Sequence, residues 1–379
     1  MIPDLPQQQK IFGLDAMRVL AILLVLSAHC LWIFEGHKSL FTKIVSFSGF
    51  MGVEIFFVLS GYLIGGSLYR IFTDSGFDYQ KVRRFLKRRS LRIMPSYLLI
   101  LCVNLVVAFL IGLSVDEPWK YFLFLQNFAH PMLPFFPESW SMSIKEIPYF
   151  IIPFGLLVVA AVFRGIDRGK LFFIFIFMLY LSAIGNKIWF HVEHSDTMSM
   201  HDWNISLRSV FVFRYDAVLT GVLFFWLRSR FRNIWANYKW HFAILGILLF
   251  GSMAFITGVA KLSLANYPFF WNVCLLPLLS LASAMSLPFF SEWTSASVIL
   301  DKPVTFLGNI SYSIYLIHYS LVLWLMKQFF PTANLSVPML FGYMIIYLSI
   351  TIGLSWLLYS YYEKPILKWR MRLTKYGQG

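Results

Sequence analysis

Ten long apolar runs divide this chain almost from end to end and constrain its fold more than any other feature. A helix needs about 20 mostly apolar residues to cross a bilayer. Because the chain is 59% hydrophobic and only 13% charged, water could not be the solvent for these runs. We therefore predict an all-α, polytopic membrane protein with about ten transmembrane helices. The predicted spans are residues 14–33, 45–69, 91–113, 149–163, 171–190, 209–227, 240–258, 269–289, 304–330 and 338–362.

The runs leave little room for a soluble domain. We expect one membrane domain over residues 1–379, with spans at about 14–362 and a short basic cytoplasmic tail at 363–379. The first ten residues lack the basic region and cleavage site of a secretory signal peptide, so the first run is predicted to be a retained helix. Residues 119–136 are apolar but broken by His130, Pro131 and Pro134, and we expect a re-entrant or interfacial segment there.

Lys and Arg gather at alternate ends of the runs, which predicts the orientation. Cytoplasmic loops of membrane proteins carry an excess of these residues, so both termini are predicted to be cytoplasmic. The densest group is KVRRFLKRRSLR, at 81–92. It could anchor to anionic lipid or bind a polyanionic cytoplasmic ligand. The net charge of +14 therefore has an explanation without nucleic acid, and we expect no nucleic-acid partner.

The first run contains Asp15, Arg18 and His29, although charge is costly in such a run and usually functional. Arg18 and His29 are eleven positions apart, which places them on one helix face and roughly 16 Å apart along the axis. Alone, Arg18 could extend to the interface and His29 could be a satisfied interhelical histidine. Their occurrence together favours a site, and histidine is the side chain best suited to proton transfer near neutral pH.

Other polar residues inside or beside the runs are further candidates. The loop near 191–202 holds several His and acidic residues, but their spacing fits no metal motif, and we expect a solvated loop and no metal. The remaining candidates in the runs are Glu54, Ser60, Trp140, Ser141, Glu146, Arg214, Asp216 and His318.

Taken in order, these segments resemble the acyltransferase-3 family of integral membrane O-acyltransferases. Arg18 and His29 reproduce the Arg-x10-His signature of its first helix, and Arg89 with Arg92 forms its Arg-x-x-Arg element. The matching segments are GVEIFFVLSGYL, RRSLRIMPSY, LQNF, SWSMSIKEIPYFIIP, FRYDAVLTG, GNISYSIYLIH and EKP. The family usually has Glu five residues after the Trp. Here Lys145 occupies that position and Glu146 follows, turned by about 100° on a helix, which leaves the role of this acid open.

The resemblance implies an enzyme of a bacterial inner membrane. It would transfer an acyl group, most often acetyl from cytoplasmic acetyl-CoA, to a hydroxyl of an extracytoplasmic polysaccharide, glycan or glycolipid. The expected partners are thus acyl-CoA, a carbohydrate or glycolipid acceptor and the lipid bilayer, and the oligomeric state stays open. Because few residues follow the tenth run, we expect the membrane domain, its outer loops or a partner protein to handle the acceptor.

The expected site residues follow from the same resemblance and from their chemistry. Arginine binds phosphate through two hydrogen bonds, so the expected CoA-binding residues are Arg18, Arg89 and Arg92. His29 would act as general base or as acyl carrier. Arg18 would also belong to the catalytic group, and Glu54 or Glu146 would orient the imidazole. The candidate oxyanion donors are Ser60, Trp140 and Ser141.

Two other function classes stay open. A proton-coupled transporter or flippase of an envelope glycan precursor would also use polar midplane residues and about ten spans, although the sequence lacks the paired, inverted halves common in transporters. A sensor or scaffold would carry intramembrane Arg and His without a use for them. The ordered motifs favour the enzyme.

Overall fold

The computed structural model describes residues 11–36, 39–194, 198–260 and 262–369. These residues form helices and turns without a strand, which confirms the all-α prediction. Most of the predicted basic tail, and the first ten residues on which the signal-peptide argument rests, lie outside the described ranges. The long helices are α1 (Phe12–Cys30), α2 (Leu40–Thr73), α3 (Tyr79–Leu110), α5 (Trp140–Val162), α6 (Arg168–Glu193), α8 (Tyr215–Arg230), α10 (Lys239–Gly258), α13 (Val298–Ile317) and α15 (Val337–Leu358).

Shorter elements connect or extend the long helices. Four of them are π-helical and two are 3-10 turns, types often found where a helix carries a functional site. The α-helical ones are α4 (Trp119–Phe122), α7 (Met200–Trp203), α9 (Arg232–Asn237), α11 (Leu276–Met285), α12 (Leu287–Glu292) and α14 (Leu325–Phe329). The others are η1 (Pro137–Ser139), η2 (Asn204–Arg208), η3 (Phe211–Phe213), η4 (Phe270–Leu275), η5 (His318–Trp324) and η6 (Tyr359–Glu363).

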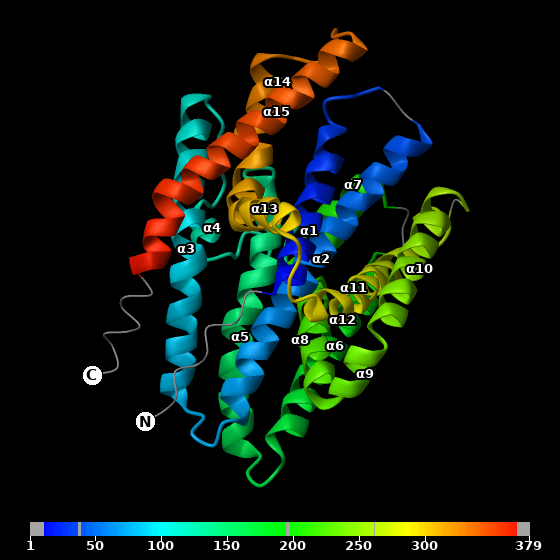
Figure 1. Cartoon of the computed structure of the whole chain (residues 1–379). Coiled ribbons are helices and arrows are strands. Elements are labelled where there is room, and N and C mark those ends of the chain that lie inside the picture. The colour runs from blue at the N-terminus through cyan, green and yellow to red at the C-terminus, as the bar shows by residue number, and fades with distance from the viewer. Residues whose placement is uncertain (1–10, 37–38, 195–197, 261, 370–379) are drawn as a thin grey trace.

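Within the described ranges, nine helical segments are long and apolar enough to cross a membrane, which confirms a polytopic protein. Helices α1 and α2 run in opposite directions through the bundle, as do α5 and α6 (Figure 1). The sixth predicted run, at 209–227, differs from its prediction because α8 has only 16 residues and begins at Tyr215. The loop before α5 takes the backbone hydrogen bonds of the missing turn: the Phe211 N–H donates to the Asn127 carbonyl at 2.9 Å.

The helix predicted at 149–163 is longer in the structure than in the prediction. With η1, helix α5 forms a 26-residue segment, Pro137–Val162, that starts twelve residues earlier. The missed turns contain Ser141, Ser143 and Glu146, whose polarity hides them from a hydropathy pattern, yet all three are buried against neighbouring helices. The segment 119–136 contains only the four-residue helix α4 and turns, as expected for a piece that does not span.

Helix α1 lies between α2 and α13 in the bundle (Figure 1). Beside α1, glycines allow the backbones of α2 and α8 to approach each other closely. A Cβ atom on Gly61 would lie 1.9 Å from the Val218 carbonyl oxygen, and one on Gly221 would lie 2.0 Å from the Val58 carbonyl oxygen. The backbones therefore touch, as in other helix pairs that use small residues. This contact fixes α2, and with it the helix face against which α1 packs.

Candidate active site

Arg89 of α3 and Glu146 of α5 mark the first polar cluster. The arginine cluster consists of Arg89, Arg92, Lys145, Glu146 and Tyr149. The Nη2 atom of Arg89 lies 3.9 Å from Glu146 Oε1, and Lys145 Nζ lies 3.8 Å from the same oxygen. The Arg89 guanidinium stands 4.0 Å from the centre of the Tyr149 ring. Arg92 is close enough for its charge to act on Glu146.

Glu363, the acid of the EKP motif, lies beside this cluster. The Ser313 hydroxyl donates to Glu363 Oε1 at 2.7 Å, and the charge of Arg92 reaches the same carboxylate. Three cations thus surround two carboxylates, and one positive charge is left over. In addition, Arg89 Nε and Glu146 Oε1 are buried without a hydrogen-bond partner among the described residues. Such groups normally find a partner, so the cluster is suited to bind a polar anion.

His29, at the other end of α1 from Arg18, marks the second cluster. The histidine cluster consists of His29, His318, Tyr319, Glu138 and Arg208. The ring centre of His29 lies 4.8 Å from that of His318 and 5.3 Å from that of Tyr319. His29 Nδ1 is 2.8 Å from the Val25 carbonyl oxygen. Because a carbonyl can only accept, Nδ1 carries the proton and Nε2 keeps its lone pair.

His318 has the same hydrogen-bonding arrangement as His29. Its Nδ1 lies 2.9 Å from the Tyr315 carbonyl oxygen, so this ring also donates through Nδ1. Its Nε2 is buried and has no hydrogen-bond partner among the described residues. The two neighbouring imidazoles therefore both present an Nε2 lone pair, which is the form a general base requires.

Glu138, which the sequence analysis missed, faces the π-helical segment η5. Its Oε1 accepts the Ser320 backbone N–H at 3.0 Å and the Ser320 hydroxyl at 2.6 Å. Its Oε2 is buried without a hydrogen-bond partner in the described part of the chain. Glu138 lies in a Pro- and Phe-rich stretch that reads as a loop. The signal that could have found it is its place two residues before Trp140.

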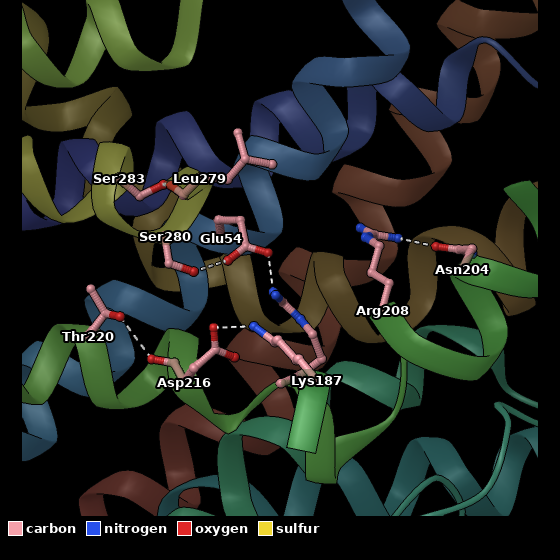
Figure 2. Close-up of polar contacts among 10 residues, drawn as sticks. Glu54, Lys187, Asn204, Arg208, Asp216, Thr220, Leu279, Ser280 and Ser283 are labelled. Atoms are coloured by element: carbon pink, nitrogen blue, oxygen red, sulfur yellow. Dashed lines mark hydrogen bonds and ion pairs between the residues drawn. The ribbon is translucent and has the colours of Figure 1, made fainter. Parts of the chain in front are cut away.

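Arg208, also missed from the sequence, comes from the π-helical segment η2. Its guanidinium lies 4.1 Å from the ring centre of Phe50 and 5.0 Å from that of Trp140. It donates to Asn204 Oδ1 at 2.7 Å, as Figure 2 shows. Its Nε is buried and unpartnered within the described ranges, and its charge reaches His29. A free N–H beside the imidazole could serve a developing negative charge.

Glu54 belongs to neither cluster. It is buried beside α8 and α11, where the Arg214 guanidinium donates to Oε1 and the Ser280 hydroxyl donates to Oε2 at 2.6 Å (Figure 2). A second pair, Lys187 with Asp216 at 2.5 Å, lies next to it. We call Glu54, Arg214, Lys187 and Asp216 the charge network. The structure therefore places Glu54 against Arg214, not against His29.

The other predicted residues divide between the two clusters. Arg18 pairs with Asp15 at 2.5 Å, at the opposite end of α1 from His29. Glu146, Arg89 and Arg92 meet in the arginine cluster, and Ser60 lies near Tyr149 there. The structure thus separates Glu146 from His29. Trp140 and Ser141 lie beside the histidine cluster, where Trp140 contacts Arg208 and the Ser141 hydroxyl is 3.4 Å from the Glu138 carbonyl oxygen.

Two segments, η1 with α5 and α13 with η5, connect the clusters. Glu138 of η1 and Glu146 of α5 are eight residues apart, or roughly 12 Å. Along α13 and η5, Tyr312 and His318 are six residues apart, or roughly 9 Å. The Tyr312 ring lies 5.4 Å from Lys145 Nζ, which places it at the arginine cluster. Each of these two segments therefore contributes residues beside both clusters.

Comparison with known proteins gives relatives of one kind. SACOL0978 of Staphylococcus aureus strain COL, whose name places it provisionally among the O-acetyltransferases, is 25% identical over 378 residues. The O-acetyltransferase OatA of Staphylococcus aureus strain NCTC 8325 is 24% identical over 386 residues. Each alignment covers 94% of this chain and 57% of the relative. The chain thus spans little more than half the length of these relatives.

The family comparison covers nearly all of the helical bundle. No solved structure matches the chain. The acyltransferase domain matches residues 11–360, a range that includes both clusters and the helices that connect them. This chain belongs to the acyltransferase-3 family.

Proposed function

We propose that this protein is a membrane O-acyltransferase that moves an acetyl group from cytoplasmic acetyl-CoA to a hydroxyl of an extracytoplasmic glycan or glycolipid. The observation that carries the proposal is that one segment, η1 with α5, reaches both polar sites. Lys145 and Glu146 lie in the cationic cluster. Glu138, roughly 12 Å away along this segment, faces η5, whose His318 lies beside His29 of α1. The family and the names of the relatives support the reaction class.

The arginine cluster is the proposed donor site. Its excess positive charge and its unpartnered Arg89 Nε fit a polyphosphate ligand. Arg89, Arg92 and Lys145 would hold the phosphates of CoA, and Arg18 would contribute from α1. Acetyl-CoA supplies the activated thioester. The Tyr149 ring lies under the Arg89 guanidinium and helps to hold it beside Glu146.

The histidine cluster is the proposed place of reaction. His29 Nε2 takes the proton of the acceptor hydroxyl, whose oxygen bonds to the acyl carbon while the carbon–sulfur bond breaks. The imidazolium then returns that proton to the departing thiolate, so charge and protons balance. Arg208 donates its free Nε–H to the oxygen that becomes negative in between. Nε2 is the atom of His29 that acts in this step, because Nδ1 donates to the Val25 carbonyl oxygen.

Glu138 is the acid that we propose to support the reacting imidazoles. It faces the segment that carries His318, and its free oxygen offers an acceptor for a proton or a hydroxyl. The predicted support of His29 by Glu54 or Glu146 would require both acids to leave their present partners. We therefore assign the supporting role to Glu138 and the donor-site role to Glu146.

The proposed setting is a bacterial inner membrane with both termini in the cytoplasm. The distribution of Lys and Arg along the sequence supports this orientation, because the basic start of α3 and the other basic loops fall on one side. The arginine cluster then lies toward the cytoplasm, and His29 toward the opposite side. An acyl group could thus be passed across the membrane without moving the acceptor inward.

The test uses sealed inside-out vesicles, acetyl-CoA labelled in the acetyl group, and envelope glycan in the lumen. Wild-type protein is expected to place base-labile label on luminal carbohydrate. His29→Ala should accumulate normally and transfer nothing. The matched control is His241→Ala, an exposed histidine on α10, which should transfer like wild type.

Two results would overturn the proposal. Normal transfer by His29→Ala would remove His29 from the chemistry. Glycan movement into or out of the vesicles without any acyl-CoA, together with no binding of acetyl-CoA, would instead make the protein a transporter.

A further inference from the structure

A pocket opens where α1 ends, next to the histidine cluster. It has a volume of about 290 Å³ and is lined by Trp32 and Glu35 after α1, and by Tyr319, Trp324, Lys327 and Gln328 of η5 and α14. Tyr319 belongs to both sites, because its ring centre lies 5.3 Å from that of His29 and 5.9 Å from that of Trp32. A ligand in the pocket would therefore stand one side chain away from the proposed base.

The chemistry of the lining is that of a site for a sugar. Trp32 is 51% exposed and offers a flat apolar face, as carbohydrate C–H groups require. Glu35 and Gln328 offer oxygen acceptors, and the Gln328 amide also donates, which suits hydroxyl groups. Ligand pockets usually combine aromatic walls with a few polar groups in this way. With a volume near the lower end of the ~300–1,000 Å³ typical of such pockets, it suits one ring and not a long chain.

The charge of the pocket narrows the ligand further. Lys327 Nζ donates to the Glu35 carboxylate and, at 2.8 Å, to the Trp32 carbonyl oxygen. The two charges cancel, so the pocket has no excess charge for a phosphate or a uronic acid. A sugar carboxylate placed here would also meet Glu35. The lining therefore favours an uncharged pyranose.

We infer that this pocket holds the acceptor, as a neutral pyranose residue stacked on Trp32 with a hydroxyl directed past Tyr319 toward His29. The inference rests on the proposed function, since it names the acceptor of that reaction. The Lys327 contacts hold the chain after α1 against α14, so they keep Trp32 in place as one wall. Trp32 and Glu35 are thus assigned to acceptor binding and selectivity, and not to the chemical step.

The test measures binding without acyl donor. Full-length protein in nanodiscs is mixed with methyl glucoside or methyl glucuronide, and saturation-transfer NMR reports which sugar protons touch the protein. Wild type should bind the glucoside through one ring face and the glucuronide more weakly. Trp32→Ala should lose most of the signal and raise KM for the glucoside in acetyl transfer roughly tenfold at unchanged kcat. Trp32→Phe should keep much of it.

Two further variants keep the test sharp. Trp119→Ala is the matched control, because Trp119 is 53% exposed and lies outside the pocket, and it should bind like wild type. Glu35→Gln should narrow the difference between glucoside and glucuronide. Equal binding by Trp32→Ala and wild type, or no glucoside binding by wild type, would overturn the pocket assignment. His29→Ala should still bind the glucoside, so a failure of the proposed mechanism would be distinguishable from a failure of the pocket.

Discussion

The charge network is buried and the histidine cluster is buried or half-buried, yet their charged groups have different partners. In the charge network every charge has an opposite partner: Glu54 with Arg214, and Lys187 with Asp216. In the histidine cluster Glu138 and Arg208 are bonded only to the neutral groups of Ser320 and Asn204. No ion pair involves either residue in the described part of the chain.

This difference distinguishes charged groups that stabilise helix packing from charged groups that are available to bind a ligand. Removing one member of a buried pair leaves a charge without compensation, which costs far more than the pair contributes. The charge network therefore fixes how α2, α6 and α8 pack. An acid or a guanidinium without an opposite charge beside it lacks that stabilisation, and such sites often have a binding or catalytic use. Substitutions at paired and at unpaired charges test this difference.

The largest effect is expected in the charge network. Glu54→Gln leaves Arg214 buried and unpaired, so the free energy of unfolding should fall by about 3–5 kcal/mol and little folded protein should accumulate. Size-exclusion chromatography of a fluorescent fusion measures this. The double variant Glu54→Gln with Arg214→Met should recover much of the folded protein. Wild-type amounts of Glu54→Gln with lost transfer would return Glu54 to the catalytic group.

Glu138→Gln should show the reverse pattern. Gln keeps an oxygen for Ser320, so the protein should fold, while loss of the carboxylate should lower kcat by roughly 10²-fold. Acetyl transfer and melting temperature are measured on the same preparation. A matched change to Glu35→Gln, in the pocket but remote from the imidazoles, should spare kcat. Equal losses of melting temperature in Glu138→Gln and Glu54→Gln would abolish the contrast.

The arginine cluster lies between these extremes, because its charges are paired but one positive charge remains. Arg89→Ala should raise KM for acetyl-CoA by roughly tenfold or more, from the loss of a charge-assisted hydrogen bond, and should leave kcat nearly unchanged. Arg84→Ala, on the exposed face of the same helix, is the control. The donor-site assignment fails if both variants bind acetyl-CoA like wild type.

The smallest effect is expected for an exposed pair. Lys81 holds the pKa of Asp74 below its usual range, with help from the Gly76 N–H, at the turn between α2 and α3. A depressed pKa contributes stability above the unfolded-state value, and this stability is lost as pH falls through the folded value. Lys81→Met should therefore lower the melting temperature only slightly at neutral pH, and not at all in acid. A large drop would mean that exposed and buried pairs contribute alike.

Most of the long helices could be predicted because a long apolar run indicates a helix that spans the membrane. The misses share one physical cause. Helix α5 was predicted to start late because its first turns are polar, and 209–214 were predicted as helix because they are apolar although a neighbouring loop takes their hydrogen bonds. Hydropathy measures the tendency of a side chain to leave water. It does not report which groups form hydrogen bonds with that residue in the folded protein.

The same limit applies to the site. His29 stands out because an ionisable group in an apolar run is conspicuous, and Arg89 and Arg92 stand out in the Arg-x-x-Arg element of the densest basic segment. The structure places all three in polar clusters. Glu138 and Arg208 lie outside such runs in the sequence and reach the site only through η1 and η2. Glu54 looked like a partner for His29, but its true neighbour, Arg214, is 160 positions away. Pairing over such distances follows from packing and cannot be read from spacing.

The π-helical segment η5 carries a consequence for how this protein can vary. A π turn holds one residue more than an α turn, so η5 is equivalent to an α-helix with a single inserted residue. Deleting one residue there would restore the α-helical register and rotate His318 by about 100° relative to α14. His318 and Lys327 would then no longer serve the same side of the bundle. A relative that has all of these side chains but lacks one residue of η5 would not bring them together. The number of residues in η5 therefore matters to the proposed active site as much as their identity.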